Sequence, residues 1–118
     1  MFSHIMLGAS DIEASRKFYD ATLGALGYGP GVMDPKGRVF YITDTGIFAI
    51  STPIDGNPAT AANGGTIGFA SPSVEASEAW HAAGRRRGGR ASPDPPARCR
   101  ACYPRSAPWA SAAPWGLE

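Results

Sequence analysis

The chain has 118 residues, enough for one domain with a single hydrophobic core and too few for two. Apolar residues make up 43% of it and charged residues 18%, a composition that indicates a globular protein and excludes a coiled coil or a wholly disordered chain. The net charge of +1 supplies no overall field for nucleic acid or an anionic membrane surface, and every apolar stretch is far shorter than the roughly 18 residues of a membrane span. We therefore expect neither nucleic acid nor membrane as a partner. Because Met1–His4 lacks the basic start and apolar run of a secretory signal, we expect a cytoplasmic location.

Composition changes near Gly84. Residues 1–83 carry four basic and eight acidic side chains, whereas residues 84–118 carry seven arginines and two acids. The second segment also holds six of the eleven prolines and no Val, Ile, Phe or Met. A segment without β-branched aliphatic residues cannot easily form core strands, so residues 84–118 are predicted to be an atypical Arg/Pro-rich tail. One hypothesis is that part of this tail is translated out of frame from a GC-rich gene, which translating the other two frames would test.

The beginning of the chain predicts a strand followed by a helix. Residues 2–9 are predicted to form a strand, with His4, Met6 and Gly8 on one face and Ile5 and Leu7 on the other. Ser10 and Glu13 have the spacing of a capping box, in which each side chain binds the backbone N–H at the other position, and this predicts where the helix starts. Apolar residues then recur at helical intervals, and Gly24 or Gly27 can end the helix in a left-handed conformation.

A meander of strands is expected after the helix. Asp34–Gly37 has the residues that a type I turn favours. Residues 38–43 alternate as a strand, residues 44–46 form a turn, and residues 47–51 form the next strand. The predicted order of elements is therefore β-α-β-β-β, followed by a linker over residues 54–64.

The start of this pattern recurs later in the chain. Residues 4–21 align with residues 66–83 at a constant offset of 62 without a gap, and five of the 18 pairs are identical. The predicted strand, cap region and apolar stripe coincide, with Phe18 aligned to Trp80. A repeated βα start implies two similar modules related by a pseudo-twofold axis, because neither can bury its sheet face alone. The predicted organisation is a single domain over residues 1–118, made of a first module (2–53), the linker (54–64) and a second module (65–118) that includes the atypical tail.

Several short motifs within residues 2–84 carry a family resemblance. They are His4–Gly8, Asp11–Ser15, Phe18–Asp20, Leu23–Gly24, Leu26–Tyr28, Gly64–Ala70 and Ala79–Gly84. Together they resemble the glyoxalase, bleomycin-resistance and extradiol-dioxygenase superfamily, also called vicinal oxygen chelate proteins. The resemblance implies an α+β fold of paired βαβββ modules whose curved sheets enclose a cleft, commonly completed by dimerisation. We expect the second module to be atypical or incomplete, because the tail departs from the family.

The same resemblance implies a protein that binds a small molecule. Such a protein could be an enzyme that acts in the cleft between the modules, either a glyoxalase-like lyase or isomerase or a dioxygenase. Two alternatives stay open: a metal-free module that sequesters its ligand, as antibiotic-binding relatives do, and an inactive truncated member. The expected partners are a small-molecule ligand and a second copy of the chain, which would form a homodimer.

Metal-using relatives take one ligand from the first strand of each module and another, usually Glu, from the last. His4 matches the first of these positions, but the offset places Thr66 where the second histidine would lie. The closing strand of the first module offers only Ala49 and Ser51. One imidazole cannot hold a catalytic divalent ion, because such sites need three or more protein ligands. The sequence therefore supports no cofactor; a family metal (Zn, Ni, Mn or Fe) would have His4 as its one matched ligand.

Candidate ligand-binding residues lie on the strands expected to face the cleft: His4, Met6, Tyr41, Ala49, Ser51, Thr66 and Gly68. His4 is open to four interpretations: a vestigial metal ligand, a hydrogen-bond donor in the cleft, a general base, or a satisfied polar residue of the sheet. Tyr41 and Arg38 have the chemistry to meet a ligand carboxylate or ring, and ordinary cross-strand packing also accounts for them. Glu13 and Glu75 are better explained as helix caps than as paired catalytic carboxylates.

Three further features predict no function of their own. Cys99 and Cys102 form a CxxC motif without a second pair of ligands or the preceding strand of a redox site. Arg85–Arg87 and Arg90 lack the aromatic platform or recognition helix that nucleic-acid binding requires. His81 is expected at the surface of the second helix.

Overall fold

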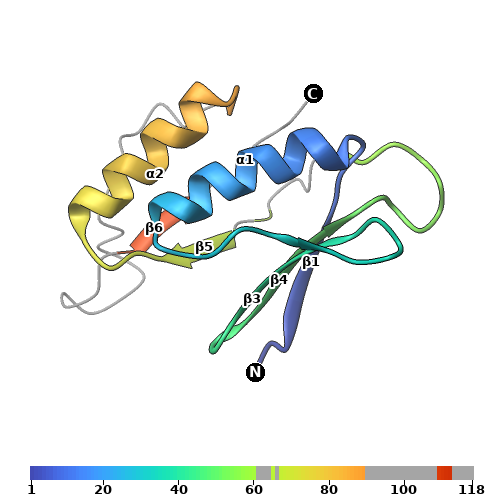
Figure 1. Cartoon of the computed structure of the whole chain (residues 1–118), viewed down its shortest axis with the longest axis horizontal. Coiled ribbons are helices and arrows are strands. Elements are labelled where there is room, and N and C mark those ends of the chain that lie inside the picture. The colour runs from blue at the N-terminus through green and yellow to red at the C-terminus, as the bar shows by residue number, and fades with distance from the viewer. Residues whose placement is uncertain (61–64, 66, 90–108, 113–118) are drawn as a thin grey trace.

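The computed structural model describes residues 1–60, 65, 67–89 and, as backbone alone, 109–112. The elements in chain order are β1 (His4–Gly8), α1 (Ile12–Ala25), β2 (Val32–Met33), β3 (Val39–Thr43), β4 (Gly46–Ser51), β5 (Ile67–Ala70), α2 (Val74–Arg86) and β6 (Trp109–Ala112). The two helices pack against each other and lie together on one side of the strands (Figure 1). In the described part of the chain, no helix is long and apolar enough to cross a bilayer.

The first five elements form a four-stranded sheet with one helix, in the predicted order β-α-β-β-β. The strand order is β1-β4-β3-β2, with β1 parallel to β4 and the other two pairings antiparallel. The predicted turn over Asp34–Gly37 is closed by the Gly37 backbone N–H, which donates to the Asp34 carbonyl at 3.0 Å. The two-residue turn after Thr43 pairs that residue with Gly46. The predicted α+β fold with a complete first βαβββ module is therefore confirmed.

α1 begins one residue later than the predicted capping box requires. Asp11 is the N-cap, and its carboxylate accepts a hydrogen bond from the Ala14 backbone N–H at 2.9 Å. The Ser10 hydroxyl instead accepts a bond from the backbone N–H of Ala59, also at 2.9 Å. The prediction of a Ser10–Glu13 capping box was therefore wrong, because the adjacent aspartate is an equally good N-cap and takes that position. Glu13 lies in the first turn, where its charge complements the helix dipole.

The hydrophobic core lies between the sheet and the two helices. Its buried members come from β3, β4, α1 and α2: Val39, Tyr41, Phe48, Ile50, Leu23, Leu26 and Trp80. Phe48 meets the rings of Tyr19 and Phe69 edge to face, with ring centres 4.8 and 5.2 Å apart. The strand residues of this core all lie on one face of the four-stranded sheet, because side chains alternate along a strand. The helices therefore leave the opposite face of that sheet uncovered.

β5 and α2 repeat the start of the first module. Ser73 is the N-cap of α2, 62 positions after Asp11, and its hydroxyl accepts a bond from the Ala76 backbone N–H at 3.1 Å. The buried serines Ser15 and Ser77 are separated by the same 62 positions. β5 pairs with β6 in an antiparallel two-stranded sheet. Predictions about residues 61–64, 90–108 and 113–118, which include the CxxC motif, lie outside the described residues.

Candidate functional site

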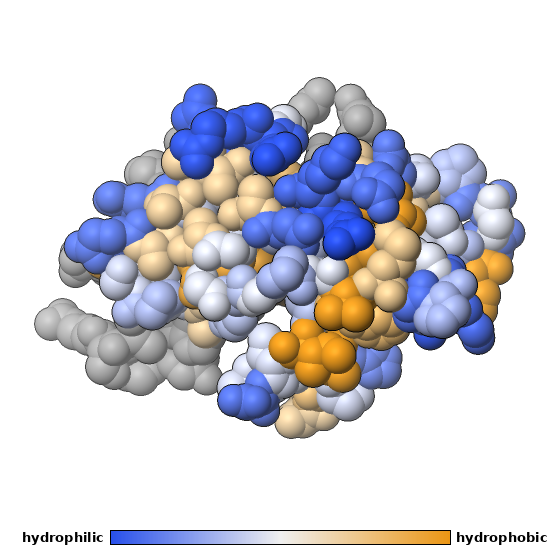
Figure 2. Space-filling model, viewed as in Figure 1, coloured by the Kyte–Doolittle hydropathy of each residue, from blue (hydrophilic) through white to orange (hydrophobic). Residues whose placement is uncertain are grey.

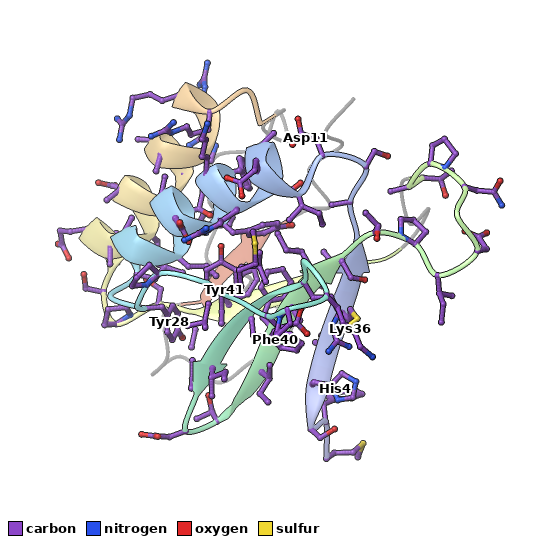
Figure 3. The ribbon with its side chains drawn as sticks, turned by 45° about the vertical axis from the view of Figure 1, so that its right-hand side comes forward. His4, Asp11, Tyr28, Lys36, Phe40 and Tyr41 are labelled. Carbon is purple, nitrogen blue, oxygen red and sulfur yellow. The ribbon has the colours of Figure 1, made fainter. Side chains whose placement is uncertain are left out.

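The face of the four-stranded sheet turned away from α1 carries most of the candidate residues, and we call it the open face. The backbone register aligns Met6, Ala49, Phe40 and Val32 across β1, β4, β3 and β2. The complete set of side chains on this face is His4, Met6, Val32, Phe40, Ile42, Ile47, Ala49 and Ser51. Figure 3 shows Tyr41 between the strands and α1, with Phe40 and His4 on the other side. The structure therefore brings together four of the predicted residues: His4, Met6, Ala49 and Ser51.

The exposed apolar side chains of the open face lie on its edge strands, β1 and β2, and at one end of β3. Met6, Val32 and Ile42 keep 40%, 64% and 68% of their surface exposed. Ala49 is buried between its register neighbours Met6 and Phe40. In Figure 2, strongly hydrophobic side chains gather over part of the strands, whereas the helices carry hydrophilic side chains among weakly hydrophobic ones. A cluster of large apolar side chains left in water is typical of a binding surface.

Polar groups lie at both ends of the open face. His4, on β1, is exposed, and its Nδ1 lies 2.9 Å from the Ser3 hydroxyl. At the opposite end, the Arg38 guanidinium lies over the Phe40 ring, 5.2 Å from its centre. Arg38 Nε donates to the Asp34 carboxylate at 2.8 Å, and Nη2 binds the same oxygen. This side-chain hydrogen bonding by Arg38 lowers the pKa of Asp34 below its ordinary value.

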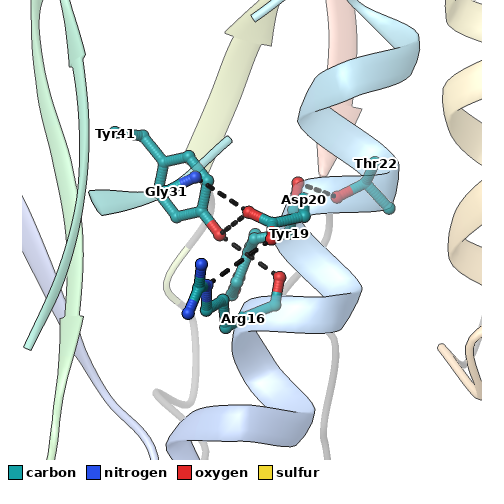
Figure 4. A network of polar contacts seen from close by, with 6 residues as sticks. All are labelled: Arg16, Tyr19, Asp20, Thr22, Gly31 and Tyr41. Atoms are coloured by element: carbon teal, nitrogen blue, oxygen red, sulfur yellow. Dashed lines mark hydrogen bonds and ion pairs between the residues drawn. The ribbon is translucent and has the colours of Figure 1, made fainter. Parts of the chain in front are cut away.

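Tyr41 does not belong to the open face. It is buried in the core, and its hydroxyl donates to the Asp20 carboxylate at 2.9 Å. The same carboxylate oxygen accepts a bond from the Gly31 backbone N–H at 2.9 Å, and Arg16 Nε lies 3.6 Å from the other oxygen (Figure 4). Burial, and then the bond to Asp20, raise the pKa of the Tyr41 hydroxyl. Burial alone raises the pKa of the neighbouring Tyr19 to about 12.

Sequence reasoning missed the role of Asp20 and overestimated that of Tyr41. One feature of the sequence could have indicated that Asp20 forms polar contacts with the sheet. Asp20 lies four residues after Arg16, so the two side chains are neighbours on a helix face that also has to meet the sheet. The signal for Tyr41 was the two-residue turn at residues 44 and 45. Once that turn pairs Thr43 with Gly46, Phe40 must lie opposite Ala49, and Tyr41 must point to the other face. Phe40 is thus the aromatic residue of the open face.

The remaining candidates do not join this group. Gly68 is exposed on β5, and a Cβ added there would meet no atom within 4 Å. Thr66 lies outside the described residues. His81 lies half-buried on α2, and Arg85–Arg87 are exposed at the end of that helix.

The side chains of the first module do not supply the ligands that the divalent metal of the family would need. His4 is the one imidazole on the open face, and Ala49 and Ser51 stand on the closing strand. A methyl group and a hydroxyl that already donates to the Thr52 carbonyl are poor ligands for such an ion. Among residues 1–60, 65 and 67–89, no three His, Cys, Asp or Glu side chains gather closely enough to hold a metal.

A concave feature separate from the open face lies at the ends of α1 and β5. It is a shallow pocket of about 280 Å³ lined by Leu26, Gly27, Tyr28, Ala70, Ser71 and Pro72. The Tyr28 hydroxyl donates to the Ala70 carbonyl at 3.3 Å across it. Its lining has no charged side chain and none of the open-face residues, so the open face is the better candidate site.

The comparisons agree with this architecture. No family model matches the sequence, and no curated protein matches it. The chain is similar to a glyoxalase/bleomycin resistance protein from Albidiferax ferrireducens T118, whose crystal structure matches with a TM-score of 0.78. The two sequences are 54% identical, and the match covers 81% of this chain and 77% of that one. An identity this high over so much of both chains shows common descent, and the chain belongs to the glyoxalase/bleomycin resistance protein family.

Proposed function

We propose that this family member binds a small molecule on the open face. The observation that carries the proposal is that Met6 and Ile42 remain exposed on the one side of the sheet that neither helix covers. Phe40 adds an aromatic ring next to Ile42 on β3 and across Ala49 from Met6, and His4 and Arg38 supply polar groups at the two ends. An apolar surface with a few polar groups at its edges is the usual composition of a small-molecule site.

Binding without a metal accounts for these residues better than lyase or dioxygenase chemistry does. Both activities in this family depend on a metal, and the first module supplies one donor, His4. A sequestering module needs only apolar contact and a few hydrogen bonds. Elemental analysis of the purified protein tests this choice. Near-stoichiometric Zn, Ni, Mn or Fe would contradict metal-free binding and favour an enzyme.

We also propose that a second copy of the chain closes the cleft. Met6, Val32 and Ile42 leave apolar surface exposed on this face, and such surface is a common place for association with another chain. In the described part of the chain, only β4 pairs with β1, so one edge of β1 is available to another strand. Sedimentation velocity should show a dimer, and a well-folded monomer at micromolar concentration would contradict this part of the proposal.

Binding itself can be measured with N-phenyl-1-naphthylamine, an uncharged aromatic dye that fluoresces in apolar sites. Ile42→Ser should weaken dye binding about fivefold, because it removes apolar contact area from the open face. Ile54→Ser is the matched control, since Ile54 is fully exposed on the loop after β4 and off the sheet. Equal weakening by both substitutions, or no saturable binding to the original chain, would overturn the proposal.

A further inference from the structure

The end of the open face next to the β2–β3 turn is positively charged. Because β3 is antiparallel to β4, this turn lies at the end of the sheet where β4 finishes with Ser51. Arg38 directly precedes β3 and has its guanidinium over the Phe40 ring, so its charge adjoins the apolar row of the open face. The exposed Lys36 lies in the same turn. Figure 3 shows Lys36 with Phe40 and His4 on the side of the sheet away from α1.

Asp34 fixes the orientation of the Arg38 guanidinium but leaves some of its N–H donors unbonded. Asp34 Oδ2 accepts hydrogen bonds from Nε and Nη2 of Arg38. Asp34 Oδ1 accepts hydrogen bonds from the backbone N–H groups of Lys36 and Arg38, each at 2.9 Å. A guanidinium has five N–H donors, and these contacts with Asp34 use two of them. The Asp34 side chain is 19% exposed, compared with 38% for Arg38. The anion of this pair therefore faces the turn, and the cation keeps donors that face the solvent.

Among the described residues, no acidic side chain of the open face balances the positive charge of Lys36. The eight side chains of this face include no Asp or Glu. Lys36 forms no ion pair with any of the described residues. Arg38 and Asp34 neutralise each other, so Lys36 leaves a net positive charge beside the apolar row.

From this geometry we propose that the ligand is an amphipathic anion. Its apolar body would lie across Met6, Ala49 and Phe40, and its carboxylate, phosphate or sulfonate group would meet Arg38 and Lys36. A guanidinium held by a carboxylate is a preorganised donor for such groups, because its planar fork matches two oxygens at once. This inference rests on the proposed function, since it names the class of ligand that the open face takes.

A pair of dyes with one ring system tests the charge preference. 8-Anilinonaphthalene-1-sulfonate carries a sulfonate, and N-phenyl-1-naphthylamine is the same skeleton without it. We expect the sulfonate to bind about tenfold more tightly at low salt and to lose this advantage as salt screens the charges. Lys36→Gln should weaken sulfonate binding about threefold and leave binding of the neutral dye unchanged. Lys17→Gln removes the same charge from an exposed site on α1 and should change neither dye.

Arg38→Lys tests whether the planar guanidinium or only its positive charge is needed for sulfonate binding. It keeps one positive charge at that position but loses the two-pronged geometry, so sulfonate binding should fall while circular dichroism stays unchanged. Equal affinity for both dyes, or no effect of Lys36→Gln, would overturn the anion inference and leave the proposed binding function standing. If neither dye binds, both proposals fail. Competition between sulfonate binding and self-association would show that a second copy occupies the charged end, which also overturns the inference.

Discussion

The hydroxyl of Tyr41 on β3 lies 2.9 Å from the carboxylate of Asp20 on α1, to which it donates a hydrogen bond. The same carboxylate accepts the Gly31 backbone N–H just before β2. One side chain of the helix thereby joins a central strand and the loop that leads to the edge strand. These contacts lie on the face of the sheet that α1 covers, alongside the hydrophobic core, and leave the opposite face open.

Tyr41→Phe should lower the free energy of unfolding by about 1–2 kcal/mol, because it removes the donor and leaves the Asp20 carboxylate with one bond fewer. Urea unfolding followed by circular dichroism measures the change. Tyr28→Phe is the matched control, since its hydroxyl makes a longer, exposed bond of 3.3 Å to the Ala70 carbonyl and should matter little. Equal losses in the two variants would contradict the importance of the Asp20 junction.

Gly31→Ala should destabilise the protein by about 1–3 kcal/mol through overpacking. A Cβ at this position would lie 2.7 Å from Cζ of Tyr41 and even closer to Val39, and both side chains are buried on β3. Gly29→Ala, two residues earlier, would place its Cβ where no atom lies within 4 Å and should be neutral or slightly stabilising. Thermal unfolding of the two variants provides the comparison, and similar melting temperatures would show that the chain yields easily around Gly31.

Local sequence patterns predicted the first module well, because its strands, turns and helix starts depend on interactions between residues that are close in sequence. Alternation located β3 to within one residue, and the Asp-Pro-Lys-Gly sequence located the turn before it. The repeat at offset 62 is matched by the N-caps Asp11 and Ser73. Each of these features depends on neighbours within a few residues, which is the range over which side-chain chemistry specifies the backbone.

The composition of the candidate site was harder to predict because it depends on contacts between distant residues. Alternation shows that Phe40 and Tyr41 point to opposite faces, but only the packing of α1 decides which face is covered. The contact of Ser10 was likewise not predictable, because its hydroxyl accepts a bond from the Ala59 backbone N–H, 49 residues away. Arg38 was considered for a ligand carboxylate, but Asp34 and Lys36 were considered only as turn residues, so their place beside Arg38 was not predicted.

The pair formed by Asp34 and Arg38 should make stability depend on pH in the acid range. Side-chain hydrogen bonding by Arg38 holds the pKa of Asp34 in the folded protein below its ordinary value of 3.8. The stabilisation is therefore fully present above the unfolded value and is lost as the pH falls through the folded one. The difference in unfolding free energy between the original chain and Asp34→Asn should be constant above about pH 5 and should shrink below 3.8.

Asn at position 34 keeps an oxygen to accept the turn N–H groups, so the comparison isolates the charge. Asp44→Asn removes one carboxylate from the next turn, where the described residues offer it no hydrogen-bond partner, and serves as the control. A difference between the original chain and Asp34→Asn that stays the same from pH 7 to pH 3 would show that the ion pair adds nothing to the turn.

The position of the first helix cap can be tested by two neighbouring alanine substitutions. Asp11→Ala should cost about 1 kcal/mol, because it removes the acceptor of the Ala14 N–H and a negative charge at the helix N-terminus. Ser10→Ala should change stability by less than about 0.5 kcal/mol, since its hydroxyl bonds to the exposed Ala59 N–H and water can replace it. Chemical unfolding of both variants decides between the two caps. A larger loss for Ser10→Ala than for Asp11→Ala would favour the Ser10–Glu13 capping box and an α1 that starts one residue earlier.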